Sequence, residues 1–175
     1  IFLLGSSLLV YLIIYVPKFD YIQGRIFSFF NRETGPHNFQ SDKAIDSITS
    51  GGFFGKGIGE GTLKNRVPEA HTDYIISVIS EEFGVIAIIL ILLLFLIFIY
   101  SVFKKVFLEN DEKIKLILVG CISLILMQAM IHIGVNIRLF PTTGMTLPYI
   151  SYGGSSIISI SILSGIILNL TKRNL

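Results

Sequence analysis

The sequence has little charge and almost no cysteine. Only 15% of its 175 residues are Asp, Glu, Lys or Arg, whereas an average soluble domain has about 25%. The hydrophobic fraction is 52% and the mean hydropathy is +0.74. These values exclude intrinsic disorder and argue against a soluble globular domain. The single cysteine, Cys121, excludes an intrachain disulfide and the usual zinc-binding spacings.

Two further absences narrow the class of protein. The net charge of +2 is too small to indicate a nucleic-acid partner. The chain begins at Ile1 inside an apolar run, without the positive segment and cleavage site of a signal peptide. We therefore expect the C-terminal part of a longer membrane protein.

Four apolar stretches predict membrane-spanning helices at residues 1–17, 83–103, 116–137 and 149–171. About 20 apolar residues cross a bilayer, and in lipid such a run must be helical to satisfy its own backbone. The last helix is expected to start near Tyr149, because Pro141 and Pro148 disfavour helix before them. The predicted fold is an all-α polytopic helix bundle.

The segments between the spans predict the orientation. Lysines crowd the short connection 104–115, and Lys172 and Arg173 lie in the tail 172–175. Short loops rich in Lys and Arg stay in the cytoplasm. The loops 18–82 and 138–148 are then extracytoplasmic. The long loop holds 16 of the 26 charged side chains, which places most of the polar chemistry on the outer face.

The first half of the long loop predicts one short helix and a glycine-rich segment. The helix covers residues 41–50, with Ser41 as its N-cap and Gly51-Gly52 at its end. Six glycines follow within residues 51–61, but Lys56 precedes Gly57 where a Walker motif needs Ser or Thr. Two interpretations remain open: a strap over the membrane surface, or a backbone that a bulky substrate can approach closely.

The end of the long loop concentrates charge just before a span. Asp73 has two interpretations: an N-cap, for which Thr72 would also serve, or a general base at the membrane surface. In the second interpretation the cations Lys64 and Arg66 could hold phosphate. His71 is a hydrogen-bonded loop residue or a catalyst. Glu81 and Glu82 mark the bilayer edge, or supply a second carboxylate or a metal ligand. The full segment reads KNRVPEAHTD.

The short outer loop and the third span carry the remaining polar patterns. Residues 138–156 read RLFPTTGMTLPYISYGGSS, a poor continuous helix. One face of the last helix is expected to carry Ser151, Ser155 and Ser159, either for close helix packing or for substrate contact. A polar stripe on the third span either bonds helices together or lines a cavity for a lipid substrate. The stripe consists of Gln128, His132 and Asn136.

Two long strings resemble a known family. SITSGGFFGKGIGEGTLKNRVPEAHTDYIISVISEEFG and LFPTTGMTLPYISYGGSS are similar to the SEDS family, the FtsW, RodA and SpoVE peptidoglycan polymerases. The second string is more like the FtsW branch, which serves cell division, than the RodA branch, which serves elongation. The family fold has about ten helices, and this chain corresponds to the last four, at about 20 residues per span.

The resemblance implies a glycosyltransferase that polymerises lipid II at the outer face of the bacterial inner membrane, at the septum, and releases undecaprenyl pyrophosphate. It gives Asp73 the role of the essential aspartate, a base for the acceptor hydroxyl. It implies a class B penicillin-binding transpeptidase and other divisome proteins as partners. Further candidate substrate-binding residues are Lys64, Arg66, Glu69, His71, Thr72, Arg138, Ser151, Gly153, Gly154 and Ser155.

The sequence departs from the family pattern at three positions, and two other functions stand as alternatives. His132 stands where the family usually has Asn, Arg138 where Gly is common, and Thr143 where FtsW often has Lys. We expect Arg138 to place a compensating cation at the outer mouth. Mg²⁺ or Mn²⁺, held by Asp73, Glu81 and Glu82, is an alternative stabiliser of pyrophosphate. The other functions are a lipid II flippase and a non-catalytic divisome scaffold.

Overall fold

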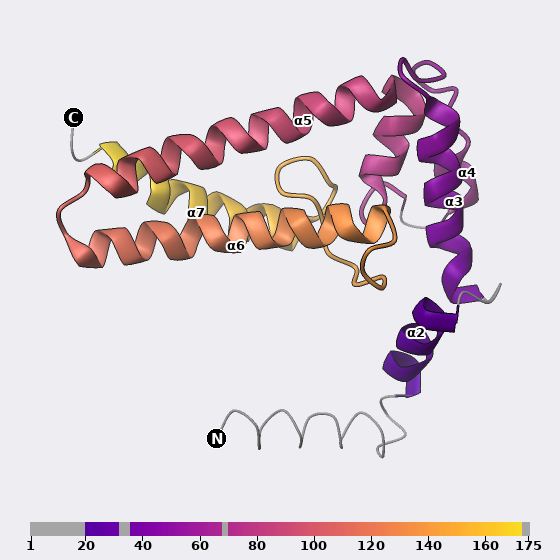
Figure 1. Cartoon of the computed structure of the whole chain (residues 1–175), viewed down its shortest axis with the longest axis horizontal. Coiled ribbons are helices and arrows are strands. Elements are labelled where there is room, and N and C mark those ends of the chain that lie inside the picture. The colour runs from indigo at the N-terminus through magenta and orange to yellow at the C-terminus, as the bar shows by residue number, and fades with distance from the viewer. Residues whose placement is uncertain (1–19, 32–35, 68–69, 173–175) are drawn as a thin grey trace.

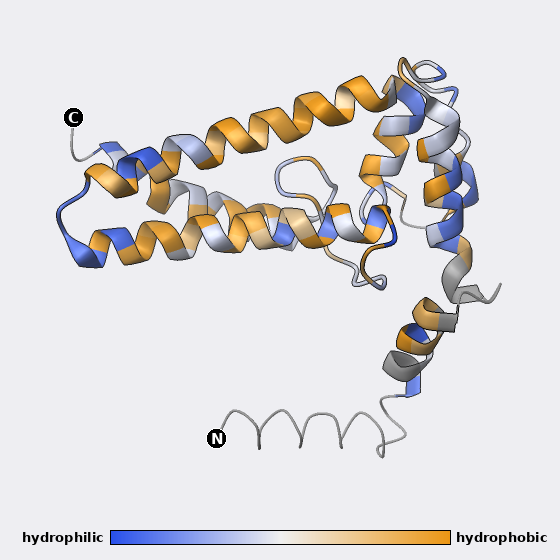
Figure 2. Ribbon diagram, in the orientation of Figure 1, coloured by the Kyte–Doolittle hydropathy of each residue, from blue (hydrophilic) through white to orange (hydrophobic). Residues whose placement is uncertain are grey.

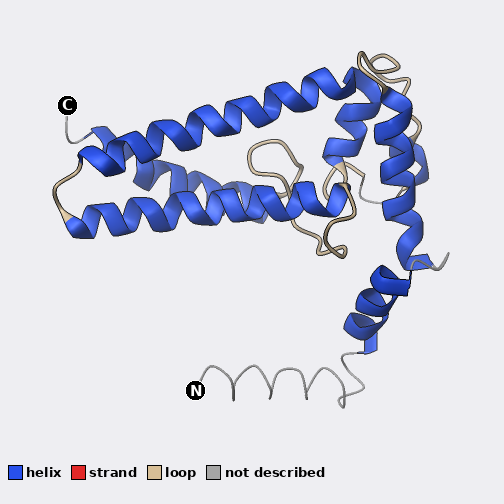
Figure 3. Cartoon of the chain, viewed as in Figure 1, coloured by secondary structure: helices blue, strands red, loops and turns tan. Residues whose placement is uncertain are grey.

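The computed structural model describes residues 20–31, 36–67 and 70–172, which form helices and loops and contain no strand (Figure 3). The predicted first span, 1–17, lies outside the described residues. The helices, in chain order, are α2 (Asp20–Asn31), α3 (Pro36–Gly51), α4 (Leu63–Arg66), α5 (Ile75–Leu108), α6 (Glu112–Asn136) and α7 (Gly154–Lys172).

Three of these helices form a bundle. Figure 1 shows α5, α6 and α7 side by side, and each is long and apolar enough to cross a membrane. A buried cluster including Val102, Leu118, Ile122 and Ile167 joins them near the α5–α6 turn. Figure 2 shows that the polar residues gather at that turn and at the opposite end, where α3 and α4 lie. The all-α membrane fold is therefore confirmed.

Helix α5 is longer than the predicted span 83–103 and is broken near its start. Gly84 has φ 78° and ψ −178°, a conformation open to glycine and strained for other residues. A Cβ atom at Gly84 would lie 2.1 Å from the carbonyl oxygen of Phe53. Residues 75–83 therefore leave the line of the long helix and run beside α3 (Figure 1).

Helix α7 begins at Gly154 and not near Tyr149. Tyr149 has φ 66°, which no α-helix contains, and residues 137–153 form an irregular segment between α6 and α7. Irregular backbone at membrane depth requires protein or water around it. Side chains supply part of that: Arg25 donates to the carbonyl of Thr142 at 2.7 Å, and Gln128 donates to that of Thr146 at 3.0 Å.

Helix α3 contains the predicted helix 41–50 but begins earlier, at Pro36. Proline is favourable in the first turn of a helix, where its missing N–H costs nothing. The prediction that Ser41 is the N-cap is therefore wrong: Ser41 is buried inside the helix. Ala44, fully buried, packs in a cluster with Leu63, Tyr74 and other residues, so α3 forms one wall of the structured loop.

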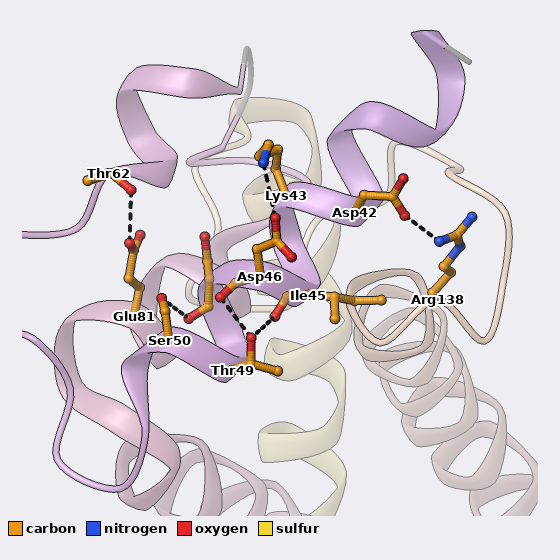
Figure 4. A network of polar contacts seen from close by, with 10 residues as sticks. Asp42, Lys43, Ile45, Asp46, Thr49, Ser50, Thr62, Glu81 and Arg138 are labelled. Carbon is orange, nitrogen blue, oxygen red and sulfur yellow. Dashed lines mark hydrogen bonds and ion pairs between the residues drawn. The ribbon is translucent and has the colours of Figure 1, made fainter. Parts of the chain in front are cut away.

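Arg138 does not stand alone at the outer mouth, because it pairs with Asp42 of α3 (Figure 4). This ion pair joins the short loop after α6 to the long loop. The backbone of Arg138 has φ 58°, the left-handed region in which glycine is unstrained. The left-handed backbone therefore explains why glycine suits this position. The ion pair with Asp42 compensates for the strain that arginine bears there.

Two substitutions at position 138 separate backbone strain from the ion pair. Arg138→Ala loses the pair and keeps the strain, whereas Arg138→Gly loses both. We expect Arg138→Gly to be more stable than Arg138→Ala by about 1 kcal/mol, the lower end of the cost of the left-handed region. Thermal unfolding of the full-length protein in detergent measures the difference. A glycine variant no more stable than the alanine variant would contradict this explanation.

Candidate functional site

Three consecutive backbone carbonyls, those of His71, Thr72 and Asp73, are held by donors from elsewhere in the chain. The N–H of Tyr152 donates to His71 at 3.2 Å, and Ser151 Oγ donates to Thr72 at 2.8 Å. Asn136 Nδ2, at the end of α6, donates to the carbonyl of Asp73 at 2.9 Å. We call this arrangement the carbonyl clamp. It fixes the turn that precedes α5 against α6 and the segment before α7.

The polar stripe of α6 supplies much of this clamp. Asn136 is fully buried, and its Oδ1 accepts from the N–H of Ser77 at 3.2 Å and from Ser77 Oγ at 2.8 Å. His132 Nε2 lies 3.3 Å from the carbonyl oxygen of Thr72. These contacts favour the first interpretation of the stripe, in which its polar groups bond separate segments together. Every such bond offsets the cost of burying a polar group.

The structure places Asp73 one residue before the N-cap position. Helix α5 starts at Ile75, and its N-cap residue is Tyr74, whose side chain makes no capping hydrogen bond. The Asp73 carboxylate instead faces the irregular segment: a Cβ built on Gly144 would lie 3.7 Å from Asp73 Oδ2. Burial, and to a smaller extent the Asp73 charge, raises the pKa of the Tyr74 phenol, so this neighbour stays protonated and neutral.

Gly144 also lines an open pocket of about 330 Å³ with a mixed polar and apolar lining. Its walls come from the middle of α6, the irregular segment and the first turns of α7. The lining residues are Gln128, Gly144, Met145, Thr146, Gly153, Ser155, Ser156 and Ser159.

Gln128 organises the wall of this cavity. Its Nε2 lies 3.2 Å from Thr146 Oγ1 and 2.9 Å from Ser156 Oγ, and those two hydroxyls are 2.7 Å apart. The hydroxyl and amide groups are thus fixed by each other. Such a wall suits a ligand that itself carries many hydroxyl or amide groups.

The predicted serine face divides into two roles. Ser151 is 4% exposed, accepts from the N–H of Leu147 at 2.8 Å and donates to Thr72, so both directions of its hydroxyl are used within the chain. Ser155 and Gly153 line the cavity, whereas Gly154, which begins α7, is not in its lining. Of these two serines, Ser155 is therefore placed to contact a ligand, whereas Ser151 is not.

The predicted cations lie on one short helix. Arg66 is exposed on α4, whose first residue Leu63 and C-cap Val67 pack in the cluster with Tyr74. Lys64 belongs to the same helix, but its side chain lies outside what the structure describes, as does Glu69. His71 is exposed, and Thr72 is half-buried beside Asp73.

Glu81 is a structural anchor and not a metal ligand beside Asp73. Its carboxylate is 1% exposed and accepts from Lys56 Nζ at 2.9 Å, Thr62 Oγ1 at 3.1 Å and the N–H of Leu63 at 3.0 Å. Figure 4 shows the contact with Thr62. Among the described residues, no three His, Cys, Asp or Glu side chains gather as a metal site. The expected trio with Glu82 is therefore not brought together.

Sequence reasoning missed Ser77, which completes the buried network. Ser77 follows Asp73 by four residues and is fully buried. Its spacing from Asp73 is no signal, because Asp73 lies in the turn before α5; the contact with Asn136 arises only in the fold. Its partner Asn136 was recognised only as part of a stripe.

These features define the class: a multi-pass membrane protein with a structured polar loop packed on one end of an apolar helix bundle. The chain belongs to the family of FtsW, RodA and SpoVE, described as cell cycle proteins, whose profile matches residues 1–174.

Similar proteins agree with this assignment. Two relatives, each named a probable peptidoglycan glycosyltransferase FtsW, are 37% identical: one from Caulobacter vibrioides over 89% of this chain and 40% of its own, and one from Geobacter metallireducens over 98% and 47%. A chain from a solved peptidoglycan synthase complex shares the fold, with a TM-score of 0.73, 24% identity, and coverage of 98% and 48%. This chain therefore spans less than half the length of these relatives.

Two serines on the predicted face give a matched test of the clamp. Ser151→Ala removes a buried hydroxyl and leaves the Leu147 N–H without its acceptor, so we expect a loss of about 1–3 kcal/mol in stability. Ser155→Ala changes an exposed position and should stay within about 0.5 kcal/mol. Thermal unfolding of both full-length variants provides the comparison. Equal effects would show that Ser151 does not hold Thr72 in the way described.

Proposed function

We propose that the full-length protein is a peptidoglycan glycosyltransferase that polymerises lipid II at the outer face of the bacterial inner membrane during cell division. One observation carries the proposal: the Asp73 carboxylate lies next to Gly144, which lines a pocket with several Ser and Thr hydroxyls at the loop-bearing end of a membrane helix bundle. The names of the curated relatives support the same reaction.

Asp73 acts as the general base in this proposal. Its carboxylate takes the proton of an acceptor sugar hydroxyl as that oxygen forms a bond to the anomeric carbon of the lipid-linked donor. The bond from that carbon to the pyrophosphate oxygen breaks, and lipid pyrophosphate leaves. The carbonyl clamp holds the backbone of Asp73, and such positioning lowers the entropic part of the barrier.

The two ends of the substrate need different surroundings. The cavity at Gly144 is lined by uncharged groups, which suit a sugar better than a pyrophosphate. The charge of the leaving group is assigned to Arg66, with Lys64 of the same helix, by charge-assisted hydrogen bonds. The segment before α7 also lines an apolar groove of about 220 Å³ against α5, including Phe95, Phe98 and Pro148, which suits part of a polyprenyl chain.

The proposal extends to partners and location. The family resemblance supports a transpeptidase of the class B penicillin-binding type as partner and the septum as the site of action. The solved complex, which combines polymerization and crosslinking, supports a crosslinking partner. Mg²⁺ or Mn²⁺ would need ligands other than Glu81, whose carboxylate is bound to Lys56, Thr62 and Leu63, and we assign no step to a metal.

Substitution of Asp73 tests the base. Asp73→Asn keeps the size of the side chain and its backbone contact with Asn136 but removes the proton acceptor. We expect the full-length variant to assemble with its transpeptidase and to make no glycan from labelled lipid II, a loss of at least about a hundredfold, as is usual for a general base. If this variant retains polymerisation, Asp73 is not the base.

Gln128 tests the sugar cavity. Gln128→Leu keeps the shape but removes the donor that orders Thr146 and Ser156, so we expect KM for lipid II to rise about tenfold, the equivalent of one or two hydrogen bonds. The turnover number should change much less, because Asp73 is untouched. Met127→Leu, at an exposed neighbouring position, is the control. An unchanged KM would remove the cavity from substrate binding.

A further inference from the structure

The glycine-rich segment 51–61 presents three large apolar side chains at its tip. Phe53, Phe54 and Ile58 are 74%, 83% and 79% exposed. Single exposed apolar residues are common on protein surfaces, but three within six residues form a small patch. Nothing in the proposed reaction uses them.

The backbone of this tip is bonded to the residues where the apolar run of α5 begins. The N–H of Val85 donates to the carbonyl of Gly52 at 3.0 Å, and that of Gly57 donates to Glu82 at 3.1 Å. Glycines permit the contact: a Cβ on Gly55 would lie 2.2 Å from the carbonyl oxygen of Glu82. The close approach is therefore to the chain's own helix, and the tip lies at the level of the break at Gly84.

Glu81 keeps the segment in this position. Its carboxylate accepts from Lys56, within the segment, and from Thr62 and Leu63, directly after it. The N–H of Lys56 also donates to the carbonyl of Glu81 at 2.9 Å. Both sides of the tip are thus tied to α5.

We propose that Phe53, Phe54 and Ile58 insert into the lipid leaflet beside the start of α5 and act as an interfacial anchor. Phe53 contacts the membrane-spanning helix directly, because its carbonyl accepts from the N–H of Ile86 at 3.5 Å, and Ile86, Ile89 and Leu90 of that helix are 50%, 57% and 60% exposed. Aromatic and aliphatic side chains at this depth bind the boundary between headgroups and acyl chains. The anchor holds α4 and the turn of Asp73 at a fixed height above the bilayer.

Spin labels distinguish lipid from water and from protein contact. The full-length protein, with its other cysteines replaced, carries a label at Phe54→Cys and is reconstituted in phosphatidylethanolamine–phosphatidylglycerol vesicles. The matched control is Glu60→Cys, an exposed polar position in the same segment. Relaxation by oxygen reports lipid, whereas relaxation by a water-soluble nickel chelate reports solvent. We expect oxygen to dominate at position 54 and the nickel chelate at position 60.

A chemical measurement on the same two variants sets the size of the effect. A membrane-impermeant maleimide should react with Cys at position 54 at least about tenfold more slowly than at position 60, because the burial of an apolar tip excludes water from it. Dominant nickel relaxation and equal reaction rates would overturn the anchor. Position 54 inaccessible to both relaxation agents would also overturn it and indicate a protein contact instead.

Discussion

The carbonyl clamp on His71, Thr72 and Asp73 is the constraint on which the rest of the site depends. A carboxylate on a surface turn would sample many positions, since loops carry few bonds of their own. Here the three carbonyls are bonded to groups from two other parts of the chain: Asn136 at the end of α6, and Ser151 and Tyr152 in the segment before α7. These two parts therefore set where the backbone of Asp73 lies.

A second constraint acts on the other side of the same turn. Glu81 binds Thr62 and Leu63, which begin the helix that carries Arg66, while glycines bring the preceding loop against α5. A buried carboxylate with three donors is strongly held, because removal of Lys56 would leave the buried charge without its opposite charge. The proposed base and the proposed cation are thus fixed by separate networks that meet in the cluster around Tyr74 and Leu63.

Much of the fold could be predicted because a backbone in lipid must satisfy its own hydrogen bonds. Runs without charge must be helical, and three of them are α5, α6 and α7. The ends were less predictable. Asp73 looks like an N-cap, yet the helix starts at Ile75, because hydrogen bonds from α6 and the segment before α7 hold the preceding turn in a non-helical form.

The sequence identifies residues that belong to the site, but not which of them are buried and which are exposed. Ser151 and Ser155 are equivalent by spacing, yet the turn ending at Gly153 buries the first and exposes the second. Glu81 and Glu82 are equivalent by sequence, yet Glu81 is buried and bonded to Lys56, a residue 25 positions earlier, whereas Glu82 is half-buried. Such separations arise from long-range hydrogen bonds, which local pattern does not encode. Asn136 was visible as a polar residue, but its partners were not.

Hydrogen exchange in the full-length protein carrying Asn136→Leu tests the central claim, that α6 holds the turn of Asp73. The amide of Ser77 loses its acceptor directly, and the amide of Tyr152 depends on the His71 carbonyl in the same clamp. The account predicts faster exchange in peptides covering both residues 70–80 and 147–153, with the α5–α6 turn unchanged. Exchange at wild-type rates in both peptides would contradict it.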